Sequence, residues 1–155
     1  MKTTHFTILL LTACICSACN LNVKYEHFYS IDTNGWNKDS TLTFPVSFDK
    51  DMQTYNLNMH IRNKNNYAYS NIWLFVNIAS PNGEQLIDTV EFTLAEPSGK
   101  WLGSGLGDLF DNKLPYKQNI AFPDSGTYQI SIQQGMRDDV LNGIDAVGIS
   151  IEKTK

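Results

Sequence analysis

Alternation of apolar and polar residues along the chain predicts a series of β-strands. Residues 55–62 (Tyr-Asn-Leu-Asn-Met-His-Ile-Arg) alternate without a break, which is typical of a strand with one buried face. Residues 41–48 alternate in the same way, but Pro45 cannot donate a backbone hydrogen bond and favours an edge or a bulge. Residues 72–78 are almost continuously apolar, which indicates a central strand covered on both faces, with Trp73 in the core.

Shorter segments with strand character follow these three, and turn-forming residues separate them. The further candidate strands are residues 87–94, 118–122, 127–133 and 146–152. The turns fall at residues 80–83, 97–99, 123–126 and 142–143. Only residues 136–141 could form a helical turn. The pattern therefore predicts an all-β domain of seven or eight short strands, an antiparallel β-sandwich for which a jelly roll is one form.

The first residues show a different pattern, that of an export signal. Lys2 precedes an apolar run over residues 6–16, which is too short to span a bilayer because a spanning helix needs about 20 residues. The run does match the apolar region of a signal peptide. We expect residues 1–18 to be removed as a lipoprotein signal peptide. Residues 19–24 are then a lipidated cysteine with a short tether, and residues 25–155 form one domain.

Two cysteines compete to be the lipidated residue. Leu-Thr-Ala before Cys14 fits the usual lipobox better by residue type, whereas Cys19 follows the small residues Ser17 and Ala18. Cleavage before Cys14 would leave an apolar run at the short limit for a signal peptide, so we favour Cys19. An ordinary signal peptide cut after Ala18 would leave an unpaired thiol, which is a liability in a secreted protein. No cysteine follows Cys19, which excludes disulfides and cysteine-based metal sites in the domain.

Charge gives no sign of nucleic-acid binding. The chain has 12 basic and 16 acidic residues, for a net charge of −4, and the two signs are interspersed. No basic patch suggests nucleic acid, and no amphipathic helix suggests binding to a lipid surface. Membrane contact is therefore expected through the lipid anchor alone. Lipoprotein processing adds several acyl chains, which makes such an anchor firm.

Candidate catalytic and metal-binding groups are sparse. After signal removal the histidines are His27 and His60, and His60 occupies a polar strand position that should face solvent. No histidine or acidic cluster has metal-ligand spacing, so we expect no metal and no cofactor. The acidic pairs Asp138–Asp139, Asp49/Asp51 and Asp108/Asp111 could serve a glycosidase, but closeness in sequence does not provide the required separation. We predict no catalytic residues and a protein that is not an enzyme.

Residues 100–108 form the most unusual segment, with three glycines in alternation. A phosphate-binding loop has its lysine after the glycines, whereas Lys100 precedes them here. The segment instead predicts a tight loop with Trp101 as an aromatic anchor, which could present a surface to a protein partner. Residues 134–139 have the same polar, glycine-containing character. The predicted partner-binding residues are Lys100, Trp101, Asp108, Gln134 and Arg137.

Tryptophans support an alternative function, since aromatic rings can stack on sugars. Trp36 and Trp101 lie in predicted loops, so they are the candidates for a glycan-binding site, although a structural role plugging the core beneath each loop is favoured over a sugar platform.

Six segments of the chain form a recognisable set: YAYSNIWLF at 67–75, DTV at 88–90, GKWLGSG at 99–105, GTY at 126–128, QQGMR at 133–137 and VGI at 147–149. Their order and spacing resemble the GldH family, the gliding-motility lipoproteins of the Bacteroidetes. The resemblance covers residues 25–152. It implies an outer-membrane lipoprotein associated with the gliding machinery and its linked protein-secretion apparatus, without established catalytic activity. For species that do not glide, envelope assembly or secretion remains the alternative role.

The resemblance also implies details of anchoring and modification. The family places its lipidated cysteine shortly before a tyrosine such as Tyr25, which favours Cys19. Surface-exposed lipoproteins of this phylum tend to carry acidic residues after the anchor. Residues 20–24 have none, so we expect the periplasmic leaflet of the outer membrane. Ser40 and Thr89 lie in the short pattern used for O-glycosylation in this phylum, and Ser40 is expected to be the more accessible.

Overall fold

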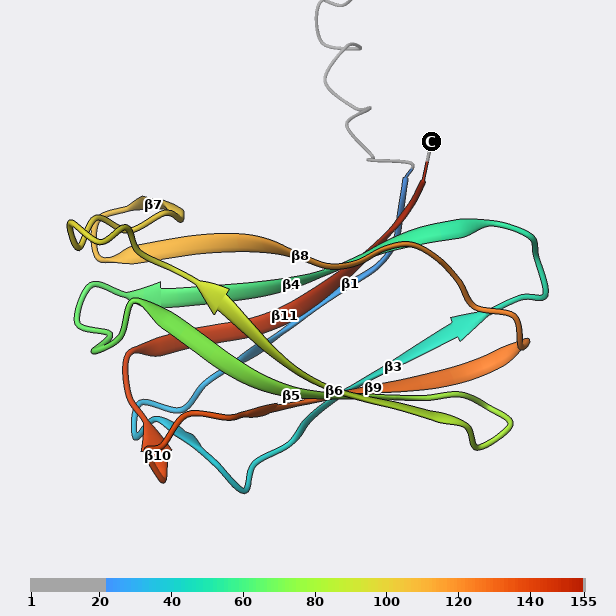
Figure 1. Cartoon of the computed structure of the whole chain (residues 1–155), viewed down its shortest axis with the longest axis horizontal. Coiled ribbons are helices and arrows are strands. Elements are labelled where there is room, and N and C mark those ends of the chain that lie inside the picture. Colours follow the sequence, from blue (N-terminus) through green and yellow to red (C-terminus); the bar gives the residue numbers. More distant parts are fainter. Residues whose placement is uncertain (1–21, 155) are drawn as a thin grey trace, which may run out of the picture.

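The computed structural model describes residues 22–154, which form two packed antiparallel β-sheets (Figure 1). The candidate lipidation residues Cys14 and Cys19 lie outside the described residues. In the order of their pairing, the first sheet consists of β1 (Val23–Ser30), β11 (Ile144–Lys153), β4 (Thr54–Lys64), β8 (Leu109–Ala121) and β7 (Ser104–Leu106). The second sheet consists of β3 (Leu42–Phe48), β9 (Gly126–Gln134), β5 (Asn71–Ala79) and β6 (Gln85–Thr93). The two-residue strands β2 (Trp36–Asn37) and β10 (Val140–Leu141) form a separate pair.

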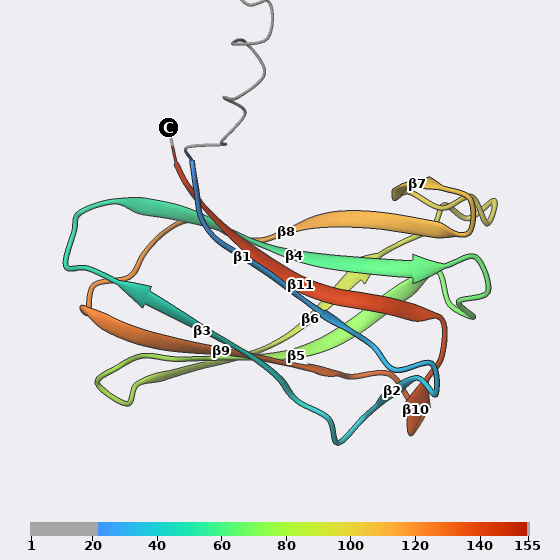
Figure 2. The same cartoon turned by 180° about the vertical axis from the view of Figure 1, so that it is seen from behind.

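The order of the strands makes this sandwich a jelly roll. Eight longer strands divide equally between the sheets, as β1-β11-β4-β8 and β3-β9-β5-β6. Neighbours within each sheet are mostly far apart in sequence, which is the arrangement of two interlocked Greek keys. Figures 1 and 2 show the two layers from opposite sides. The predicted all-β sandwich is confirmed. Within residues 22–154 the chain forms no helix, and so none that could cross a membrane.

Alternating side chains from the inner faces of the two sheets fill the core. On β4 the inward residues include Leu57 and Met59, and on β5 they include Leu74, all fully buried. Each such side chain contributes about 1.5–3 kcal/mol through the removal of apolar surface from water. A cluster of rings closes one end of the core, where Phe48 and Phe122 stack with their centroids 4.0 Å apart. The alternation predicted for residues 55–62 is thus confirmed.

Two tryptophans occupy the opposite environments from those expected. Trp73 is 39% exposed on the outer face of β5, and Phe75 beside it is 46% exposed. The strand is central in hydrogen bonding, since it lies between β9 and β6, but nothing in the described chain covers the outer face of its sheet. Trp36, expected in a loop, is only 2% exposed and packs into the core. Central position in a sheet and burial on both faces are therefore separate properties.

Some strand boundaries also differ from the sequence pattern. The pattern missed β1 and recovered only the end of β8. The earlier part of β8 was missed because polar residues and Pro115 interrupt its alternation. Residues 136–141, expected to form a helical turn, form bends followed by β10. Pro45 does lie on an edge strand, because β3 is the outermost strand of the second sheet.

Candidate functional site

Three connections meet at one end of the sandwich, and we call this region the loop end. They are residues 65–70 between β4 and β5, residues 94–103 between β6 and β7, and residues 135–139 between β9 and β10. This end lies beside β7 and β10 at the left of Figure 1, opposite the connection between β3 and β4. Both segments predicted to bind a partner contribute to it.

A row of aromatic rings supports the loop end. Ring centroids are 5.8 Å apart between Tyr69 and Tyr67, 6.3 Å between Tyr67 and Trp101, and 5.8 Å between Trp101 and Phe110. The Trp101 indole N–H donates to Asn65 Oδ1 at 3.2 Å, which fixes the ring against the first connection. Trp101 is half-buried, so part of its ring remains available at the surface.

The hydroxyl of Tyr69 connects the aromatic row to residues 135–139. It donates to Asp138 Oδ2 at 2.8 Å, and this bond is the main reason that the pKa of Tyr69 is raised. Burial raises the pKa of Tyr67, whose hydroxyl donates to the Asn71 carbonyl at 2.9 Å. Both tyrosines therefore stay neutral near pH 7 and act as structural donors.

Gln134 has a supporting position instead of the partner-binding position predicted for it. It is 2% exposed, its side-chain N–H donates to the Asp138 carbonyl, and its side-chain oxygen accepts from the Met136 N–H, each at 2.8 Å. Because both ends of its amide are used inside the loop, Gln134 shapes residues 135–139 and does not reach a partner. Arg137, in contrast, is exposed and belongs to no ion pair within residues 22–154.

The remaining predicted contact residues are exposed at the same end. Lys100 ends a turn, and its carbonyl accepts from the Glu96 N–H at 2.8 Å. The Asp108 carbonyl accepts from the Asn65 N–H at 2.8 Å, and Asp108 borders a hollow of about 470 Å³. The structure thus brings Lys100, Trp101 and Arg137 to the loop end, and the bond to Asn65 holds Asp108 beside it in the turn between β7 and β8.

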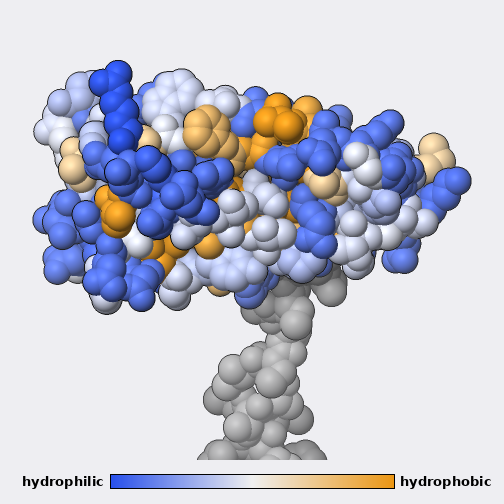
Figure 3. Space-filling model, turned by 90° about the horizontal axis from the view of Figure 1, so that it is seen from below, coloured by the Kyte–Doolittle hydropathy of each residue, from blue (hydrophilic) through white to orange (hydrophobic). Residues whose placement is uncertain are grey.

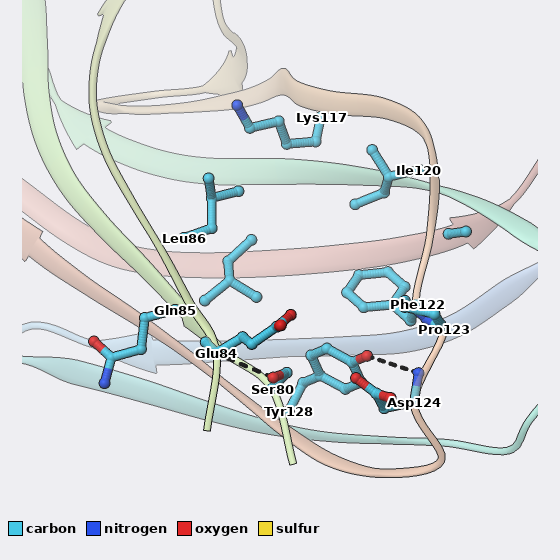
Figure 4. Close-up of a pocket in the computed structure, with 12 residues that line it drawn as sticks. Ser80, Glu84, Gln85, Leu86, Lys117, Ile120, Phe122, Pro123, Asp124 and Tyr128 are labelled. Carbon is cyan, nitrogen blue, oxygen red and sulfur yellow. Dashed lines mark hydrogen bonds between the residues drawn. The ribbon is translucent and has the colours of Figure 1, made fainter. Parts of the chain in front are cut away.

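A second concave region, missed by sequence reasoning, lies where the edges of the two sheets part. It is a groove of about 300 Å³ between β6 and β8, with Leu86, Ile120 and Phe122 in its walls (Figure 4). Leu86 occupies an inward-facing position and is nevertheless 48% exposed, because the sheets do not close over it. The groove is mainly apolar, and it lacks a set of converging reactive groups.

An ion pair ties the two sheet edges together near this groove. Lys117 Nζ lies 2.8 Å from Asp88 Oδ2, and the Tyr116 hydroxyl donates to the same oxygen at 3.2 Å. The bond from Lys117 is the main cause of the lowered pKa of Asp88, while burial raises that of Tyr116. Asp88 points inward from an edge strand, a placement that discourages unwanted strand pairing.

The acidic pairs considered for catalysis have separate structural roles. Asp138 accepts from Tyr69, Asp139 pairs with Lys38 at 2.5 Å, and Asp111 pairs with Arg62 at 2.6 Å. Asp51 accepts from the Tyr55 hydroxyl at 3.1 Å, at a different part of the sandwich. Among the residues that the structure describes, no group of three or more potential metal ligands comes together.

His60 is less accessible than its strand position suggested. It is half-buried on the outer face of the first sheet, and its Nε2 lies 2.8 Å from the hydroxyl of the buried Ser150. Burial lowers the pKa of His60, with smaller opposing contributions from nearby acidic groups. His60 therefore lies on the solvent side of its sheet, as expected, but its ring is only partly exposed.

Both predicted O-glycosylation residues are exposed. Ser40 lies in a turn, where its carbonyl accepts from the Trp36 indole N–H at 3.0 Å. Thr89 lies on the outer face of β6, directly opposite Phe75 on β5. Their modification stays a prediction. Trp36, being buried, has no ring face to offer a sugar, so the glycan-binding hypothesis based on Trp36 is wrong.

Comparison with known proteins identifies similar sequences along almost the whole chain. A family model described as GldH lipoprotein matches residues 23–151. A "Gliding motility lipoprotein GldH homolog" of Christiangramia forsetii is 40% identical over 154 residues, covering 95% of this chain and 94% of that protein. The "Gliding motility lipoprotein GldH" of Flavobacterium johnsoniae is 33% identical over 160 residues, covering 99% of both proteins.

Similarity to solved structures is weaker. The VP2 subviral particle of infectious bursal disease virus aligns with a TM-score of 0.35 and 12% identity, over 84% of this chain. The aligned region spans 30% of the VP2 chain.

Proposed function

The chain belongs to the GldH lipoprotein family, and on this premise we propose that it is a non-enzymatic component of the gliding-motility machinery. The resemblance inferred from six sequence segments is confirmed. The proposed role extends to the associated protein-secretion and envelope machinery, where the protein acts through protein–protein contacts. The named relatives support the motility assignment, and the separate structural roles of the acidic pairs support a protein without catalysis.

The proposed position of the protein is the outer membrane, with a lipid anchor at Cys19 and the domain facing the periplasm. The family description as a lipoprotein supports an anchor. The tether is short, because β1 begins at Val23. Mass spectrometry of the N-terminal peptide from the native protein tests Cys19 against Cys14. Digestion of the domain by protease added to intact cells would contradict the periplasmic orientation.

The loop end is the proposed contact surface, and the single observation that carries it is the gathering of Lys100, Trp101 and Arg137 there, with Asp108 beside them. Trp, Tyr and Arg are the residue types that most often dominate the binding energy of protein interfaces. Arg137 makes no ion pair with residues 22–154, so its charge is available to an acidic partner group. The row of rings from Tyr69 to Phe110 holds the surface in a fixed shape before binding.

Crosslinking and affinity purification of the native lipoprotein from its own membranes tests this surface. We expect motility or secretion proteins to be recovered, and Arg137→Ala and Lys100→Ala each to reduce the recovery. Lys50→Ala is the matched control, because Lys50 is an exposed cation in the connection at the opposite end of the sandwich. Equal recovery with Arg137→Ala, Lys100→Ala and Lys50→Ala would exclude the loop end as the contact surface.

O-glycosylation at Ser40 and Thr89 is proposed as a modification of the exported protein. Exposure of both side chains supports it. Intact-mass spectra of the native protein should show glycan shifts that Ser40→Ala and Thr89→Ala each reduce. A single mass without any glycan would contradict the proposal.

A further inference from the structure

The outer face of the second sheet carries exposed aromatic rings in a row. Trp73 and Phe75 are two residues apart on β5, so they point to the same side, about 7 Å apart along the strand. Ile87 of β6 is exposed on the same face, opposite Asn77. Figure 3 views the molecule from this side and shows apolar patches within a mostly polar surface.

Hydroxyl and amide groups surround this row of rings. Outward positions of β9 hold Gln129, Ser131 and Gln133, and the last two pair in register with Asn77 and Phe75. Thr43 of β3 shares a hydrogen bond of 3.2 Å with Ser131. Asn77 also lies on this face, but its Oδ1 is buried and its side-chain N–H donates to Gln85 Oε1 at 3.4 Å, so its neighbours Gln129 and Ser131 present the polar groups here.

Charge is almost absent from this face. The strand registers place a single ionisable side chain, Glu91, among the outward residues of the four strands. Glu91 is already engaged, because its carboxylate accepts from the Asn71 side-chain N–H at 2.5 Å. The part of a ligand that lies along these four strands is therefore neutral, with apolar C–H surfaces for the rings and many hydroxyls for the amides.

A hollow lies at one end of the row of rings. It measures about 440 Å³ and is lined by Tyr69, Asn71, Trp73, Gly135, Met136 and Arg137. Small-molecule sites in proteins commonly measure about 300–1,000 Å³. The hollow can therefore hold part of a small ligand while the rest extends along β5 over Phe75.

We propose that the outer face of the second sheet binds a neutral oligosaccharide or polysaccharide. Trp73 and Phe75 stack beneath successive sugar rings, while Gln129, Ser131 and the side-chain oxygen of Gln133, whose N–H is held by the Lys38 carbonyl, bond to sugar hydroxyls. Neutral sugars match this combination because each ring has an apolar face and a polar edge. The site differs from the one based on Trp36 and Trp101, and it goes beyond the protein contacts proposed for the loop end.

The test measures binding of the full lipoprotein to immobilised neutral oligosaccharides of glucose, mannose and N-acetylglucosamine. Every form tested carries Thr89→Ala, because Thr89 lies opposite Phe75 and a glycan there would cover the face. The protein is held in a detergent without a sugar headgroup, so that the detergent does not compete. We expect at least one of these sugars to bind and to quench tryptophan fluorescence. Trp73→Ala and Phe75→Ala should each weaken the affinity about tenfold, while Trp73→Tyr, which keeps a ring, should weaken it less.

Phe28→Ala is the matched control, because Phe28 is 42% exposed on the outer face of the other sheet. Failure of the protein without further substitutions to bind any of the sugars would overturn the proposal, as would equal affinity losses for Trp73→Ala and Phe28→Ala. A photoreactive residue at position 75 that captures a protein on living cells would also overturn it in favour of a protein interface. Arg137 lines the hollow as well as the loop end, so the loop-end proposal is judged separately by protein recovery with Lys100→Ala, because Lys100 does not line the hollow.

Discussion

The two sheets differ in how far the side chains on their outer faces pair with one another. On the first sheet, Arg62 pairs with Asp111 and Lys113 pairs with Glu152, both at 2.6 Å. The Phe28 ring lies against His60, with centroids 5.2 Å apart. On the second sheet, Trp73 and Phe75 stand exposed among uncharged polar side chains.

This difference separates a solvated face from a face suited to a ligand. The first face pairs its charges internally, and ion pairs of this kind keep a surface soluble without adding much stability. The second face leaves aromatic surface exposed and has few charges, the combination that typically marks a binding surface. Both faces belong to sheets that share one core. A difference in stability between a substitution on one face and a substitution on the other therefore reports on the faces themselves.

The largest expected effect is one that the two sheets share. Leu57 in β4 and Leu74 in β5 are both fully buried on the inner faces. Leu57→Ala and Leu74→Ala should each lower the free energy of unfolding by about 2–5 kcal/mol, through lost burial and the cavity that remains. Urea unfolding monitored by circular dichroism measures both. A loss confined to one variant would show that the sheets do not share the core equally.

The next largest effect is expected at two glycines, one under each outer face, which should differ in the loss of stability on substitution by alanine. A Cβ on Gly148 would lie 2.5 Å from the Phe28 ring and 2.7 Å from the His27 carbonyl, whereas one on Gly135 would lie 3.3 Å from both the Phe75 ring and the Trp73 carbonyl. Gly148→Ala should therefore destabilise the protein by about 1–3 kcal/mol, because backbone as well as a ring must move. Gly135→Ala should cost less than about 1 kcal/mol, since an exposed ring can shift.

Thermal and urea unfolding of the two glycine variants provide the measurement. If Gly135→Ala costs as much as Gly148→Ala, Phe75 is held as firmly as Phe28 and the second face is not loosely covered.

Acid should affect the first face through His60. Burial lowers the pKa of His60 below its ordinary value of 6.5, so the unfolded chain takes up the proton at a higher pH than the folded chain. The stability that neutral His60 contributes is fully present above pH 6.5, and it is lost as the pH falls from 6.5 toward the pKa of His60 in the folded protein. Urea unfolding between pH 7 and pH 5 should therefore show a smaller loss of stability for His60→Gln than for the wild type.

Gln118→Ala serves as the control for the acid experiment, because Gln118 is an exposed residue of the same sheet without an ionisable group. It should leave the pH dependence as in the wild type. An identical pH dependence for His60→Gln and the wild type would show that the protonation of His60 is not linked to folding.

The smallest expected effect concerns the ion pairs. Arg62→Gln should lower the free energy of unfolding by about 0.2–1 kcal/mol at low salt, because the pair with Asp111 is largely exposed. The loss should disappear near 1 M salt, where screening is strong. Gln129→Ala on the second face should show no such salt dependence. A loss for Arg62→Gln that persists at high salt would indicate packing by the arginine stem instead of charge pairing.

Part of the candidate site followed from the sequence and part of it did not. Trp101 and Arg137 were identified from glycine-rich polar segments that no core requires, and both lie at the loop end. Gln134 belongs to the same segment but is buried, because its amide satisfies the backbone of its own loop. Trp73 was assigned to the core, since a continuous apolar strand looks the same whether or not a further layer covers its outer face.

The sequence by itself determined the fold class, the family and most strand positions, and it restricted Pro45 to an edge or a bulge. These depend on local alternation, on turn-forming residues and on proline chemistry, which are properties of neighbouring residues. The tertiary structure alone decided the jelly-roll strand order, the burial of Trp36 and the exposure of Trp73. The physical reason is that period-two alternation separates the two sides of a strand, whereas burial depends on which distant strands pack against each side.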